Sequence, residues 1–100
     1  MLFAHETLDV YQLALSIARR LASRTWPKGQ GWLRDQAVRA SGSVVLNIAE
    51  GRGRAGDAGR NHLRIALGSV AEVAAIADLL ADESLRVDAR RVGRMLRGMV

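Results

Sequence analysis

The sequence predicts an all-α fold, a bundle of four helices that assembles as a homo-oligomer. Apolar residues recur every three or four positions, which is the spacing of amphipathic helices. The predicted helices cover residues 7–24, 32–50, 58–81 and 87–100, with short turns between them. The third helix is apolar on two sides, which predicts neighbours on both, one of them a second subunit.

The length and composition of the chain predict a single domain over residues 1–100. Apolar residues make up 49% of the chain, enough for a core, but a domain this small buries a modest fraction of its surface. The chain has no cysteine, which excludes disulfides and thiolate metal sites, and no cofactor is indicated. Because no apolar run can span a bilayer and no signal peptide precedes the domain, we expect a cytoplasmic protein without membrane contact.

The charge is strongly basic and carried almost entirely by arginine. The net charge is +5, and Lys28 is the only lysine among 15 basic residues. Arginine suits phosphate or carboxylate partners. A high-GC genome produces the same bias, so charge alone leaves a nucleic-acid partner open.

The first helix is predicted to follow a lead-in of residues 1–6, with Thr7 or Asp9 as its cap. Its inward stripe is Val10, Leu13, Ala14, Ile17 and Leu21. Pro27 and the glycines after it form the turn. We expect Trp26 and Trp32 to cover the end of the bundle; stacking on nucleic-acid bases is the alternative.

The second helix carries an apolar stripe and, beside it, five polar residues that we call the polar seam. The apolar stripe is Leu33, Ala37, Ala40, Val44 and Ile48, with Gly51 as the expected helix end. The polar seam is Gln36, Arg39, Ser43, Asn47 and Glu50. Its spacing places the five on one narrow face. Because amides and hydroxyls outnumber the charges expected of a solvated face, we predict a partly buried seam in helix pairing or a subunit contact, and not a catalytic site.

The segment from Gly51 to Arg60 contains the letters Gly-x-Gly-x-x-Gly. The dinucleotide-binding fingerprint requires a preceding strand, and here a helix precedes, so we reject that interpretation. Asp57 is expected to cap the third helix. Three arginines, Arg52, Arg54 and Arg60, form an exposed cluster that could bind phosphates or be simply solvated.

The third helix has its main apolar stripe from Leu63 to Leu80. A second set of residues on the opposite side is the predicted oligomer face. That face is Ile65, Gly68, Glu72, Ile76 and Leu79. A mid-helix glycine is tolerable where a neighbouring backbone comes close.

The fourth helix is expected to begin near Val87, after a polar turn of residues 82–84. Its inward residues are Val92, Met95, Leu96 and Met99, and its outer face carries Arg86, Arg90, Arg94 and Arg97. Asp88 is the only acid within the predicted helix. A solvated face and a polyanion contact both remain open for this basic stripe.

Motifs of the common enzyme classes are absent. His5 and His62 are isolated, no serine lies in a nucleophile elbow, and no metal-ligand cluster occurs. We therefore predict that the protein is not an enzyme and binds no metal.

Short motifs in the right order make the chain resemble a known family. They are Leu8–Ala14, Trp26-Pro27, Gln36 to Val44, Asn47–Gly51, Arg64–Ser69 and Met95–Gly98. The chain is similar to the four-helix-bundle proteins encoded in intervening sequences of 23S ribosomal RNA genes, which are related to the accessory variability determinant of diversity-generating retroelements. It departs from the family pattern at Val45 and Leu46, at Arg52, and at Asn61 and His62.

The resemblance implies an antiparallel up-down-up-down four-helix bundle that assembles into a homopentameric ring. In the retroelement relatives it implies a basic surface that binds nucleic acid and a reverse transcriptase. Two hypotheses follow. In the first, the oligomer binds RNA or DNA backbone with low sequence specificity through Arg52, Arg54, Arg60 and the arginines of the fourth helix. In the second, the ring is a scaffold that recruits a protein partner such as a reverse transcriptase.

Overall fold

Four α-helices and one short 3-10 helix make up the protein. The computed structural model describes all 100 residues. The elements are the 3-10 helix η1 (Ala4–Thr7), α1 (Asp9–Ser23), α2 (Gly31–Gly53), α3 (Gly56–Leu80) and α4 (Glu83–Arg97). There are no strands, which agrees with the predicted four-helix bundle, and the molecule measures 43 × 26 × 20 Å.

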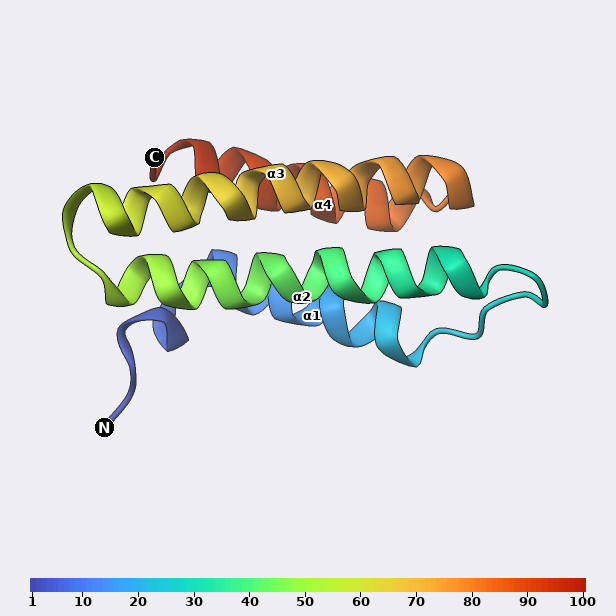
Figure 1. Ribbon diagram of the computed structural model, residues 1–100, viewed down its shortest axis with the longest axis horizontal. Coiled ribbons are helices and arrows are strands. Elements are labelled where there is room, and N and C mark those ends of the chain that lie inside the picture. Colours follow the sequence, from blue (N-terminus) through green and yellow to red (C-terminus); the bar gives the residue numbers. More distant parts are fainter.

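Each long helix packs against two others. α2 lies between α1 and α3, and α4 also contacts both α1 and α3. Figure 1 shows the chain turning back on itself between successive helices, so that the four lie alongside one another. The core therefore runs along the length of the bundle, between all four helices.

The core is aliphatic, as the composition predicts. It comprises Val10, Ala14, Ile17, Leu21, Leu33, Ala37, Ala40, Val44, Val45, Ile48, Leu63, Ala66, Val70, Val73, Ile76, Ala77, Leu85, Ala89, Val92 and Leu96. The predicted inward stripes are confirmed for most positions. Leu13, Met95 and Met99 are only partly buried and pack against the edge of this core.

The start of α1 differs from the prediction that Thr7 or Asp9 caps it. Leu8 occupies the cap position without a side-chain hydrogen bond, and Asp9 is already in the first turn. There its carboxylate opposes the positive end of the helix dipole. The lead-in is ordered as η1 because the backbone nitrogen of Phe3 donates to Glu6 Oε2 at 2.8 Å.

The two tryptophans behave differently. Trp26 packs against the core, and its Nε1 donates to the carbonyl oxygen of Leu21 at 3.2 Å. Trp32 is 63% exposed, so the prediction that it covers the bundle end is wrong. The inward position at the start of α2 belongs to the next residue, Leu33.

Gly51 does not end the second helix, contrary to the prediction, because α2 continues to Gly53. Gly51 is buried against α3, where an added Cβ would lie 2.9 Å from the carbonyl oxygen of Gly59 and from Leu63. A Cβ on Gly59 would lie 2.6 Å from the carbonyl oxygen of Gly51 and closer still to that of Arg54. These two glycines allow the backbones of α2 and α3 to meet.

The ends of α3 and the start of α4 also differ from the prediction. Ala55 occupies the N-cap of α3, so Asp57 is not the cap and lies in the first turn. α4 begins at Glu83, four residues before the predicted start at Val87. Asp82 causes this early start, since its side chain accepts a hydrogen bond from the backbone nitrogen of Leu85 at 3.0 Å.

Candidate nucleic-acid interface

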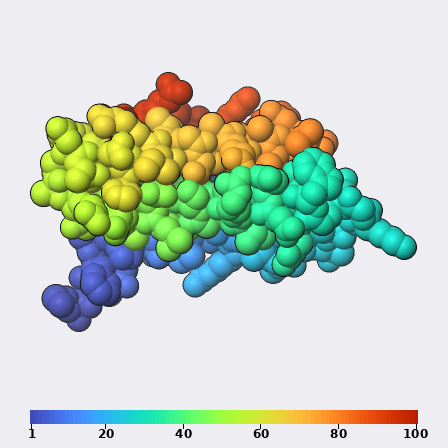
Figure 2. All heavy atoms as spheres, viewed as in Figure 1, coloured from blue at the N-terminus to red at the C-terminus, as the bar shows by residue number.

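The polar seam of α2 faces α3 of the same chain. Arg39 Nη2 lies 2.8 Å from Glu72 Oε2, and the hydroxyl oxygens of Ser43 and Ser69 are 2.8 Å apart. Figure 2 shows α2 and α3 meeting along the visible face of the molecule. The seam therefore joins two helices of one subunit, and it needs no second subunit to satisfy it.

Two members of the polar seam do not reach α3. Gln36 is exposed and accepts a hydrogen bond from Arg39 on its own helix, and Glu50 pairs with Arg54 at 3.0 Å. Only Ser43 and Asn47 are partly buried, so the predicted burial holds for the middle of the seam and is wrong for its ends. The α3 partners were not predicted, although polar residues at helical spacing along α3 were a usable signal.

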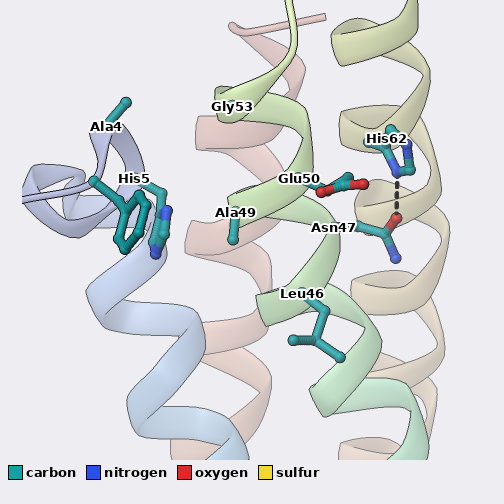
Figure 3. Close-up of a pocket in the computed structure, with 9 residues that line it drawn as sticks. Ala4, His5, Leu46, Asn47, Ala49, Glu50, Gly53 and His62 are labelled. Carbon is teal, nitrogen blue, oxygen red and sulfur yellow. Dashed lines mark hydrogen bonds between the residues drawn. The ribbon is translucent and has the colours of Figure 1, made fainter.

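A shallow hollow of about 650 Å³ lies beside the seam, between η1, α2 and α3. Figure 3 shows Asn47 and His62 side by side within it, with Glu50 nearby on α2. His5 also lines the hollow, and its ring packs edge-on to Tyr11 with centroids 4.6 Å apart. No three metal-ligating side chains gather here or elsewhere in the molecule.

The arginines on either side of the short α2–α3 connection divide into paired and unpaired groups; Arg52 lies in the last turn of α2 and Arg60 in α3. Arg54 is bound to Glu50 and Arg60 to Asp57, whereas Arg52 is exposed and forms no ion pair. The hydrogen bond and charge of Arg60 lower the pKa of the Asp57 carboxyl. Arg52 is therefore the one of these three predicted phosphate ligands whose guanidinium is not already occupied.

The basic stripe of α4 divides in the same way. Arg86 Nε lies 2.7 Å from Asp78 Oδ1 and its Nη1 lies 2.9 Å from Glu83, so it ties α4 to the end of α3. Arg86 is therefore less available to bind a phosphate than an unpaired arginine would be. Arg90, Arg94 and Arg97 form no ion pairs and are exposed. The carboxylate of Asp88 turns the other way, to Arg20 of α1 at 3.4 Å.

The fold brings Arg52 close to the C-terminal end of the chain. Figure 1 shows the C-terminus beside the connection between α2 and α3. Met99 lines a hollow of about 270 Å³ together with Gly51, Arg52 and Leu63. Arg52 and Met99, which follows the end of α4, are therefore neighbours in space, although far apart in the sequence.

Comparison with known families decides the relationship. The model of the 23S rRNA-intervening sequence protein family matches residues 6–97, almost the whole chain. The chain belongs to this family. Comparisons with curated proteins and with solved structures found no match. No helix of the protein combines the length and apolar character needed to cross a membrane.

The outward face of α3 includes only part of the predicted oligomer face. Ile65 and Leu79 are 45% and 68% exposed, and no atom lies within 4 Å of a Cβ built on Gly68. Ile76 is only 4% exposed, so its assignment to an outward face is wrong; the helix turns it toward the core. Glu72 points to Arg39 of α2.

Exposed apolar side chains also occur outside the predicted oligomer face. Leu46 of α2, which the sequence pattern did not single out, is 70% exposed. It lies on the side of α2 beyond the polar seam, and its neighbour Asn47 bonds to α3. The sequence carried a signal for it, since Leu46 stands off the apolar stripe of its helix.

Proposed function

We propose that this protein binds the phosphate backbone of RNA or DNA with low sequence specificity and catalyses no reaction. The observation that carries the proposal is that Arg52, Arg90, Arg94 and Arg97 are exposed without a carboxylate partner. Arg20, Arg24 and Arg39 are each bound to an acid of another segment. Three further arginines, Arg19, Arg64 and Arg91, are also exposed without an ion pair.

An unpaired arginine is the better phosphate ligand for a simple reason. A guanidinium already bonded to a carboxylate must give up that bond before it binds phosphate, whereas an unpaired one exchanges only water and counterions. On the C-terminal side of Asp88, α4 contains no acidic residue that could neutralise its arginines. Such a surface attracts polyanions at low salt and loses them as salt rises.

We further propose that the bundle has antiparallel up-down-up-down topology and assembles as a homo-oligomer through the outward face of α3. The turn of the chain between helices supports the topology (Figure 1). The exposure of Ile65 and Leu79 supports the assembly. The family resemblance suggests a ring of five, and a ring would present several copies of the arginine surface to one polyanion.

A second candidate function is a scaffold that recruits a protein such as a reverse transcriptase. The exposed apolar residues Phe3 and Leu46, 70% each, favour a protein contact at the hollow beside the polar seam. Pull-down from the native host separates the two functions. Recovery of nucleic acid without protein would count against the scaffold.

The proposed function is tested by titrating labelled RNA and DNA with the protein at several salt concentrations. We expect binding at low salt with little difference between sequences, and a linear fall of log K with log salt. An absence of binding at about 50 mM salt, where electrostatic binding is strong, would overturn the proposal.

A further inference from the structure

A groove between α3 and α4 places the unpaired arginines beside an apolar floor. Its volume is about 380 Å³. Leu67, Val70 and Ala74 of α3 face Ala89 and Gly93 of α4 across it. Arg90, Arg94 and Arg97 also line the groove, along its α4 side.

We propose that this groove makes the protein selective for single-stranded nucleic acid. An unpaired base lies on the apolar floor while the arginines hold the phosphates on either side of it. This inference rests on the proposed binding of nucleic acid and adds the class of strand.

The arginine row fits the backbone of one strand. At 1.5 Å per helical residue, Arg90 and Arg94 are about 6 Å apart along the axis, and Arg94 and Arg97 about 4.5 Å. The three side chains follow one edge of the groove over about two helical turns. They can therefore contact neighbouring phosphates of the same strand.

The apolar floor explains why a base is needed as well. Phosphate binding requires no apolar surface, but the flat faces of a base are its least polar part and gain from burial against aliphatic side chains. The small side chains of Ala74 and Ala89, with Gly93 between the arginines, leave room for a flat group. In a duplex the base faces are stacked on one another, so a duplex can use only the arginines.

An acidic amphipathic helix of a partner protein has a similar combination of charge and apolar surface. The arginine track of Arg90, Arg94 and Arg97, however, runs along the whole α4 side of the groove, and no carboxylate lines the groove. A flexible strand can follow such a track, whereas an amphipathic helix needs apolar surface along its whole contact. The structure therefore favours the nucleic-acid strand.

The groove can be filled without disturbing the bundle. A Cβ on Gly93 would meet only Val70 Cγ1, at an ordinary 3.8 Å, so Gly93→Leu places a side chain in the groove. Ala71→Leu fills it from α3, where Ala71 is exposed. Gly42→Leu on α2 is the matched control, since nothing lies within 4 Å of its Cβ. Circular dichroism shows whether all three variants keep the helical content of the wild type.

The test compares three probes of about 12 nucleotides, within the usual site size: a single strand, its duplex and an abasic strand with the same phosphates. We expect the wild type to bind the single strand about fivefold more tightly than the abasic strand, and more tightly than the duplex. Gly93→Leu and Ala71→Leu should remove this preference and leave abasic binding unchanged. Gly42→Leu should leave all three affinities unchanged.

The outcomes separate this inference from the proposed function. Equal, salt-dependent binding of all three probes would overturn the proposed selectivity of the groove for single strands. The proposed binding of the phosphate backbone would still stand. Binding of none would overturn both. Binding of an acidic amphipathic peptide that Gly93→Leu abolishes, with oligonucleotide binding unchanged, would assign the groove to a protein and overturn the inference.

Discussion

Asn47 of α2 and His62 of α3 are joined by a hydrogen bond of 2.9 Å between Oδ1 and Nδ1. The direction of this bond follows from Ser43, whose carbonyl oxygen lies 2.9 Å from Asn47 Nδ2. Because a carbonyl oxygen can only accept, the amide nitrogen faces Ser43 and the amide oxygen faces His62. Nδ1 of His62 therefore carries the hydrogen, and Asn47 links both helices.

Replacing Asn47 with leucine should destabilise the fold. Asn47→Leu leaves the partly buried Nδ1–H of His62 without its partner, which costs about 1–3 kcal/mol. Arg97→Ala removes an exposed, unpaired side chain and should stay within about 0.5 kcal/mol. Thermal melts measure both, and a loss of 1 kcal/mol lowers Tm by roughly 4–8 °C in a domain of this size.

The same bond can be tested by a double-mutant cycle with His62→Leu. Removing both partners should cost less than the sum of the two single changes, because neither group is then left unpaired. Strictly additive effects, or an Asn47→Leu variant as stable as Arg97→Ala, would show that water satisfies these groups equally well.

The close approach of α2 and α3 at Gly59 leads to a second prediction. Gly59→Ala forces a methyl group against the carbonyl oxygens of Gly51 and Arg54, and should destabilise the protein by about 1–3 kcal/mol. Gly42→Ala is the control, because it is helical with open space at its Cβ and should gain up to about 1 kcal/mol. Urea titrations of both variants measure the difference. If Gly59→Ala were as stable as Gly42→Ala, the two helix ends would not be in close contact.

The sequence predicted the helices because their periodicity is local information. The buried stripes of Val10 to Leu21 and Leu33 to Ile48 could be read directly from spacings of three and four. The first and last residues of the helices were harder to predict, since they depend on single capping hydrogen bonds or single contacts between helices. Gly51 resembles a helix end in the sequence, but its missing side chain serves the contact with Gly59 in a different helix.

The sequence could predict which residue type forms the candidate site, but not which of its arginines are bound to a carboxylate. The sequence singled out seven arginines, but which of them are free depends on acids brought close by folding. Arg86 meets Asp78 only because α3 and α4 turn at Ala81. Ile76 was misplaced because it lies at the border between the outward and core-facing sides of α3, where spacing alone does not decide burial.

The pairing of arginines predicts unequal effects of neutralising them. Arg52→Gln removes an exposed, unpaired guanidinium, so the slope of log K against log salt for RNA binding should fall by about 1. Arg54→Gln removes a guanidinium already bonded to Glu50, and its effect on the slope should be smaller. The two residues lie close together at the end of α2, so they are matched controls. Equal slopes for both variants would mean that Arg54 leaves Glu50 when nucleic acid binds.

The outward face of α3 supplies the last prediction. Ile65→Asp with Leu79→Asp should dissociate the oligomer, because an unpaired charge left in an interface costs about 2 kcal/mol or more, roughly thirtyfold in affinity. Both side chains are exposed in the single chain, so the folded subunit should tolerate the change, and its helical content should be unchanged. Leu46→Asp, equally exposed but on α2, is the control and should leave the mass unaltered. Light scattering coupled to size exclusion measures the mass of each variant. A wild type that elutes as a monomer, or a double variant that keeps the wild-type mass, would show that α3 does not contact a second copy.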